Sequence, residues 1–135
     1  MRCQLRVAEQ SYFAYTRQNL EPNTKAVMTS ADRINGTVGG IYSANLEVKR
    51  AITNETANHV VNGSRGVWGM VSPGGIEVTF TWSDLQFLEA GSFYFEIAVT
   101  EHMPDAYNTP FAIRASVVSN EIIVSDMAPT HRWAV

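Results

Sequence analysis

Residues 75–100 have the sequence GIEVTFTWSDLQFLEAGSFYFEIAVT, and this stretch decides the fold. Apolar and polar side chains alternate in a run at each of its ends. A strict period of two residues predicts β-strands with one buried face and one wet face. The apolar positions of the two runs are Ile76, Val78, Phe80, Trp82, Phe93, Phe95, Ile97 and Val99.

The segment between the two runs is too long for a tight hairpin. Ser83 and Gln86 have the spacing of a helix capping box, and Gly91 is a residue type that often ends a helix. We therefore predict one short helical turn at a corner that bridges two sheets. Two strands joined in this way are typical of a β-sandwich.

The rest of the chain follows the same pattern. Turn residues separate about eight or nine short segments at intervals of roughly ten residues, as expected for an all-β sandwich. We predict a single domain over residues 1–126, followed by a C-terminal tail, 127–135, that could serve as an interaction arm. The expected strands are 2–8, 11–17, 25–30, 41–53, 66–72, 75–82, 92–100, 111–119 and 121–125.

The composition narrows the classes of function. Charged residues make up 17% of the 135 residues and hydrophobic residues 45%, against a typical charged share of about 25%. The low charge suggests that other molecules cover part of the surface. A net charge of −3 excludes electrostatic binding of nucleic acid as the main activity, because that activity needs a basic surface.

Cys3 is the only cysteine, so no internal disulfide can form. It shares a face with Leu5 and Val7, which favours a buried apolar role over a reactive thiol. A chain without disulfides suits a reducing cytoplasm. No apolar run approaches the ~20 residues that cross a bilayer, and no signal peptide is recognisable. We therefore expect a protein made in the cytoplasm without a membrane partner.

No group of residues forms a convincing catalytic or cofactor site. His59, His102 and His131 lie in separate segments, and no metal-binding spacing or GxSxG motif is present. Glu101, His102 and Asp105 could bind a metal, but a solvated loop is the better interpretation. We expect no enzyme activity, no cofactor and no metal.

The three tryptophans call for separate interpretations. Trp82 is assigned to the core, and so is Trp68, although Trp68 could instead stack on a sugar. Trp133 follows Pro129 in the tail, where no local core can bury it. A terminal tryptophan of this kind can anchor a neighbouring subunit or dock on its own domain.

Two short motifs in the deciding stretch resemble a known family. TWSDL (81–85) and AGSF (90–93), followed by Glu96 in the next strand, are similar to the N-terminal domain of the phage baseplate upper protein and its small relatives. The resemblance spans residues 41–115. It implies an immunoglobulin-like sandwich with a structural or adaptor role and no enzymatic activity. The chain departs from the family in having Phe93 at the corner, which has no hydroxyl group for a tyrosine corner.

The resulting functional prediction is a non-enzymatic bacteriophage virion structural protein, either a tail or baseplate adaptor or a capsid decoration. It would reside in the virion and bind other virion proteins and copies of itself as a homo-oligomer. Exposed strand edges would contribute to these contacts. The predicted contact residues are Trp133, Arg132, His131, Met103 and Tyr107.

The alternative prediction is a carbohydrate-binding module or adhesin. In that case Tyr107, Trp68 and Tyr42 would stack on sugar rings, while Asn and Asp side chains would bind hydroxyl groups. A small β-sandwich enzyme is the least favoured class, because no convergent set of His, Asp and Glu is apparent.

Overall fold

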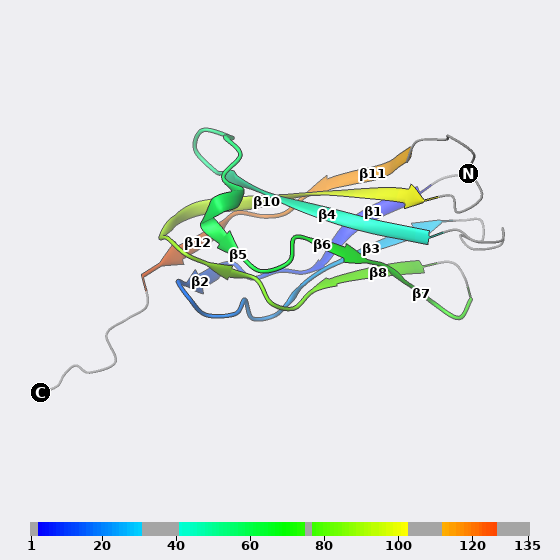
Figure 1. Ribbon diagram of the computed structural model, residues 1–135, viewed down its shortest axis with the longest axis horizontal. Helices are drawn as coiled ribbons and strands as arrows, with labels where there is room; N and C mark the ends of the chain where they lie inside the picture. The colour runs from blue at the N-terminus through cyan, green and yellow to red at the C-terminus, as the bar shows by residue number, and fades with distance from the viewer. Residues whose placement is uncertain (1–2, 31–40, 75–76, 103–111, 127–135) are drawn as a thin grey trace, which may run out of the picture.

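Two β-sheets face each other in the computed structural model (Figure 1), which describes residues 3–30, 41–74, 77–102 and 112–126. The elements, in chain order, are β1 (Cys3–Glu9), β2 (Phe13–Tyr15), β3 (Thr24–Ser30), β4 (Ile41–Arg50), the 3-10 turn η1 (Asn58–Val60), β5 (Val61–Asn62), β6 (Gly66–Trp68), β7 (Met70–Val71), β8 (Glu77–Trp82), β9 (Gln86–Phe87), β10 (Gly91–His102), β11 (Ala112–Val118) and β12 (Ile122–Ser125).

The first sheet has the strand order β1-β3-β8-β7, and all of its pairs are antiparallel. The second sheet has the order β2-β12-β10-β4-β6, and β11 also pairs with β10. β11 and β12 lie along the same side of β10, where Glu96 is opposite Val118 and Phe93 is opposite Ile122. They therefore act as one interrupted strand. β2 runs parallel to β12 at the edge.

This strand order is that of an immunoglobulin sandwich. β1, β3, β8 and β7 take the places of strands A, B, E and D in one sheet, while β12, β10, β4 and β6 take those of G, F, C and C′ in the other. The chain passes from the first sheet to the second between β1 and β2. The predicted fold class, an all-β, immunoglobulin-like antiparallel β-sandwich with one short helical turn, is confirmed.

The alternating residues of the deciding stretch form the centre of the core. Burial alternates residue by residue along β8 and β10, and their inward side chains are almost fully inaccessible to solvent. The two-residue period is therefore confirmed in both strands, while Ile76 lies outside the described residues. The inward residues are Val78, Phe80, Trp82, Phe93, Phe95, Ile97 and Val99.

The helical turn lies elsewhere than predicted. The structure places it at Asn58–Val60, whereas the corner from Ser83 to Gly91 contains the short strand β9. β9 pairs with β5, and the Gln86 side-chain amide donates a hydrogen bond to Asn19 Oδ1 at 2.8 Å. These distant partners stabilise an extended backbone where the local spacing favoured a helix. The corner nevertheless joins the two sheets, as predicted.

β4 is shorter than the predicted strand over 41–53. It ends at Arg50, because Asn54 adopts a left-handed conformation with φ 64° and donates its N–H to the Arg50 carbonyl at 2.8 Å. The turn places Ile52 outside the sheet, where 90% of its surface is exposed. Its expected position on the apolar face of the strand is therefore wrong.

The predicted strand over 66–72 is divided at Gly69 between the two sheets. Its first part, β6, pairs with β4, and its second part, β7, pairs with β8. A side chain at Gly69 would place Cβ 2.3 Å from Val78 Cγ1 and 2.7 Å from Phe80 Cε1. Only glycine therefore lets the backbone press against the core as it crosses from one sheet to the other.

Candidate functional site

A shallow hollow lies on the outer face of the second sheet, across the edge strand β6 and the neighbouring strands β4 and β10. In the register of these strands Ser43 lies opposite Trp68 on one side and Thr100 on the other. The ring of His102, at the end of β10, packs against the ring of Trp68. We call this hollow, with Ser43, Asn45, Gly66, Trp68 and His102 as its exposed lining, the Trp68 hollow.

Two aromatic rings form one wall of the Trp68 hollow. The centroids of the Trp68 and His102 rings are 5.3 Å apart, and the ring planes are inclined at 56°. Ser43 Oγ lies 2.7 Å from His102 Nε2, a hydrogen bond that fixes the imidazole ring. The Trp68 side chain is 64% exposed, and its indole N–H has no hydrogen-bond partner among the described residues. The indole ring of Trp68 therefore presents a large, flat apolar surface and an N–H donor to solvent.

Small residues leave room for the hollow beside these rings. Asn45 lies opposite Gly66 on β6 and opposite Ala98 on β10, so neither neighbour covers its amide. The hollow has a volume of about 330 Å³, at the lower end of the usual range for small-molecule sites, about 300–1,000 Å³. Its size suits one or two small rings rather than a long buried ligand.

The strand that presents Trp68 is fixed at both ends. Before it, the Arg65 carbonyl accepts hydrogen bonds from Leu46 N at 2.9 Å and from Trp82 Nε1 at 2.8 Å. After it, Gly69 N donates to the Tyr42 carbonyl at 2.8 Å. These contacts hold the backbone on either side of Trp68 and so fix the position from which the indole ring projects.

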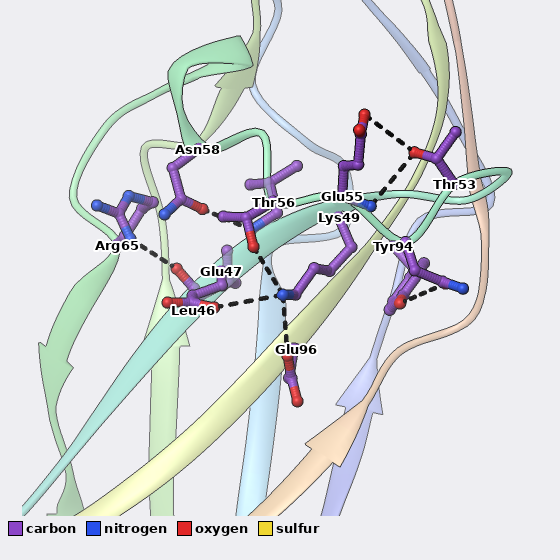
Figure 2. A network of polar contacts seen from close by, with 12 residues as sticks. Leu46, Glu47, Lys49, Thr53, Glu55, Thr56, Asn58, Arg65, Tyr94 and Glu96 are labelled. Carbon is purple, nitrogen blue, oxygen red and sulfur yellow. Dashed lines mark hydrogen bonds and ion pairs between the residues drawn. The ribbon is translucent and has the colours of Figure 1, made fainter.

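None of the lining residues of the Trp68 hollow is Asp, Glu, Lys or Arg. Charged groups lie further along the same sheet face, where Lys49 Nζ approaches Glu96 at 3.5 Å and Glu47 at 3.7 Å, with Thr56 Oγ1 at 2.7 Å. Figure 2 shows this network linking β4, β10 and the loop after β4. The network holds that loop against the sheet. Its charged groups lie outside the hollow, which therefore suits neutral ligands.

The aromatic side chains proposed from the sequence are distributed differently from expectation. Trp82 is in the core, as predicted, but Trp68 is exposed, so its assignment to the core is wrong, while its stacking on a sugar stays a prediction. Tyr42 is only 3% exposed and donates a hydrogen bond to Glu101 at 3.2 Å. It therefore cannot stack on a sugar.

The predicted contact residues of the tail and of the loop after β10 lie outside the described residues, and their roles stay predictions. The same holds for Asp105, so the loop carboxylates and His102 cannot be compared as a set. Within the described ranges, no group of three or more His, Cys, Asp or Glu is placed to hold a metal ion. Nor is any helix there of the length and hydropathy that a membrane span requires. The contact residues concerned are Trp133, Arg132, His131, Met103 and Tyr107.

The sequence interpretation missed three side chains of the site. Ser43 and Asn45 alternate with buried residues of β4, so the two-residue period places them on the outer face. His102 was considered only as a metal ligand in a loop, whereas it is the last residue of β10. The missing information was which strands are neighbours, because β6 and β10 reach β4 from distant parts of the chain.

Comparisons with known proteins return matches among solved structures alone. No family model matches the chain, and no curated protein matches it. Among solved structures, it is similar to self-complemented MyfA, the major subunit of Myf fimbriae from Yersinia enterocolitica, with 11% identity, a TM-score of 0.44, and coverage of 92% of this chain and 98% of the other. A second structure of MyfA, in complex with galactose, has 12% identity, a TM-score of 0.40, and coverage of 92% and 95%.

These matches correct the resemblance to phage proteins. No family model matches the chain, and the two solved structures named above are those of a fimbrial subunit, so the predicted membership of the phage baseplate family is wrong, and with it the predicted virion structural role and virion location. The expectations of a protein that is not an enzyme and that associates with its own copies stay predictions.

The physical reason for the error is that the two motifs serve the sandwich itself. Trp82 is buried with its N–H bonded to a backbone carbonyl, and Leu85 and Phe93 belong to the core. The Asp84 carboxylate accepts the Ser64 N–H at 3.2 Å. These roles can arise in any sandwich with a similar corner, so the motifs do not identify a family.

Proposed function

We propose that this chain is a non-catalytic carbohydrate-binding domain that holds a neutral sugar in the Trp68 hollow. The observation that supports the proposal is the exposed indole ring of Trp68, backed by His102 and bordered by an uncovered amide at Asn45. Large exposed aromatic side chains in a concave, polar surrounding are a common feature of ligand sites.

The chemistry of a sugar ring matches these groups. A pyranose has an apolar face of C–H groups and a rim of hydroxyl groups, and the face can lie flat on the indole ring. The Asn45 amide can donate two hydrogen bonds and accept others, and the Trp68 indole N–H adds a donor. The Ser43 hydroxyl retains further hydrogen-bonding capacity after its contact with His102.

The shape of the site predicts weak binding to a single sugar. The hollow is shallow and Trp68 remains largely exposed, so a ligand would bury little of its surface. We expect dissociation constants around the millimolar range, which corresponds to about −4 kcal/mol. Tight attachment to a glycan-coated surface would then require several copies binding together.

A glycan array of neutral and anionic oligosaccharides, incubated at low and at high salt with the protein displayed in many copies on beads, tests the proposal. We expect signals from neutral glycans that persist at high salt, because screening weakens interactions between charges and no Asp, Glu, Lys or Arg lines the hollow. An array without signals would contradict the proposal. So would binding confined to anionic glycans and lost at high salt.

A further inference from the structure

The strand β2 forms an edge of the second sheet with unusual apolar exposure. Phe13 is 73% exposed, Tyr15 49% and the preceding Tyr12 63%, and Ile123 on the adjacent strand is 45% exposed. Phe13 lies directly opposite Ile123 in the parallel pair, so their side chains share the outer face. This apolar edge lies at the opposite side of the sheet from the Trp68 hollow.

The backbone groups on the outer side of β2 have no hydrogen-bond partner among the described residues. Tyr12 O accepts a hydrogen bond from Ile123 N at 2.9 Å, and Thr16 N donates to Ser125 O at 2.9 Å. Because successive residues of a strand direct their backbone groups to opposite sides, Phe13 and Tyr15 turn their N–H and C=O groups away from β12. The free edge can therefore accept another strand.

β2 is short, at three residues, but it lacks the other features that usually protect an exposed edge. Native edge strands are often blocked by charged residues, proline or a bulge. β1, an edge of the other sheet, contains the charged residues Arg6 and Glu9 and has a register shift. The sequence of β2 is Phe-Ala-Tyr, without a charge or proline. An unprotected apolar edge of this kind is expected to have a partner.

We propose that this partner is the β2 strand of a second copy, paired antiparallel about Ala14. In this register Phe13 lies opposite Tyr15 of the partner subunit, and each such pair exchanges both backbone hydrogen bonds. The outward N–H and C=O groups of Phe13 and Tyr15, on either side of Ala14, thus all have hydrogen-bond partners in the dimer. Their side chains also form aromatic cross-strand pairs on the outer face.

Charge favours this antiparallel arrangement of two copies. Glu9 precedes the uncharged segment and Arg17 follows it, both are exposed, and neither has an ion-pair partner among the described residues. Antiparallel pairing brings the Arg17 end of one copy toward the Glu9 end of the other. Parallel pairing would bring like charges together.

The dimer would join the two second sheets into one continuous sheet. The symmetry axis of an antiparallel pair is perpendicular to the sheet, so the outer faces of both copies point in the same direction. If the proposed sugar binding is correct, both Trp68 hollows would face the same surface and could bind it together. The dimer itself does not depend on that function.

Sedimentation equilibrium over a range of protein concentrations tests the interface. Wild type should form dimers, and Tyr15→Lys should raise the dimer dissociation constant about tenfold or more, because it removes an aromatic pair at two places in the interface. Met70→Lys is the matched control, since Met70 is 76% exposed on the strand at the far edge of the first sheet. A monomeric wild type, or equal effects of the two variants, would overturn the proposal.

Disulfide formation tests the register in a Cys3→Ala background. Phe13→Cys and Tyr15→Cys are prepared separately and then mixed under mild oxidation. Opposed residues of a hydrogen-bonded pair have Cα atoms about 5.5 Å apart, within the range of a disulfide, whereas diagonal residues are about 7–8 Å apart. The mixture should therefore cross-link more than either variant alone. Equal cross-linking in all samples would refute the proposed register.

Discussion

Phe87→Ala is expected to lower the free energy of unfolding by about 3–5 kcal/mol, the usual cost of removing a fully buried phenylalanine ring. Phe87 is inaccessible to solvent and stacks on Phe93, with centroids 5.0 Å apart, and on Phe95, with centroids 5.8 Å apart. Its carbonyl also accepts a hydrogen bond from Arg17 N at 2.8 Å. The ring thus joins the sheet-bridging corner to β10.

Urea unfolding followed by circular dichroism measures this loss. The neighbouring Leu88→Ala is the control, because Leu88 is 42% exposed and its truncation should cost less than about 1 kcal/mol. A change in the same small range for Phe87→Ala would mean that the corner does not depend on this aromatic stack.

Trp68→Ala is expected to weaken glycan binding by about thirtyfold or more, which corresponds to about 2 kcal/mol, the level typical of a tryptophan that dominates a binding site. The ring supplies the flat apolar surface of the hollow, and no other lining residue can replace it. Because Trp68 is 64% exposed, the variant should keep its folded structure. Titration of wild type and variant with the strongest array ligand measures the difference.

Met70→Ala is the matched control for this variant. Met70 is also an exposed apolar residue, but it lies beyond Gly69 in the other sheet and does not line the hollow. The Met70→Ala variant should bind the glycan with the same affinity as wild type. If both substitutions reduced binding equally, the site would have to extend along the whole edge rather than centre on Trp68.

The sequence was sufficient to predict the sandwich because its strands alternate strictly. In β8 and β10 the period of two residues identified the inward side chains, and both strands face the core as expected. Burial of every second residue is a local property of the strand, so it can be inferred without knowledge of the partner strands.

Features that depend on distant contacts could not be predicted in the same way. Ser83 and Gln86 have a helical spacing, yet β5 pairs with this segment and makes it extended. The chain changes sheets at Gly69 because Val78 and Phe80 lie directly beneath it, and no local pattern indicates that packing.

The candidate site was only partly predictable for the same reason. The sequence suggested that Trp68 could stack on a sugar, but it did not show that His102 lies beside it. Their rings meet because β6 and β10 flank β4 on either side. Tyr42, proposed for the same role, belongs to the inward face of β4 together with Ala44, and the alternation of that strand favoured burial over exposure.

The central claim, that a neutral sugar binds in the Trp68 hollow, is tested most directly by a titration followed in ¹H–¹⁵N NMR spectra. We predict saturable shifts of the Trp68 indole signal and of the backbone amides of Ser43, Asn45 and His102. The indole signal of Trp82, which is buried and bonded to a carbonyl, should stay in place. Shifts confined to β2 or to other surfaces, or an unchanged Trp68 signal while the sugar binds, would contradict the account.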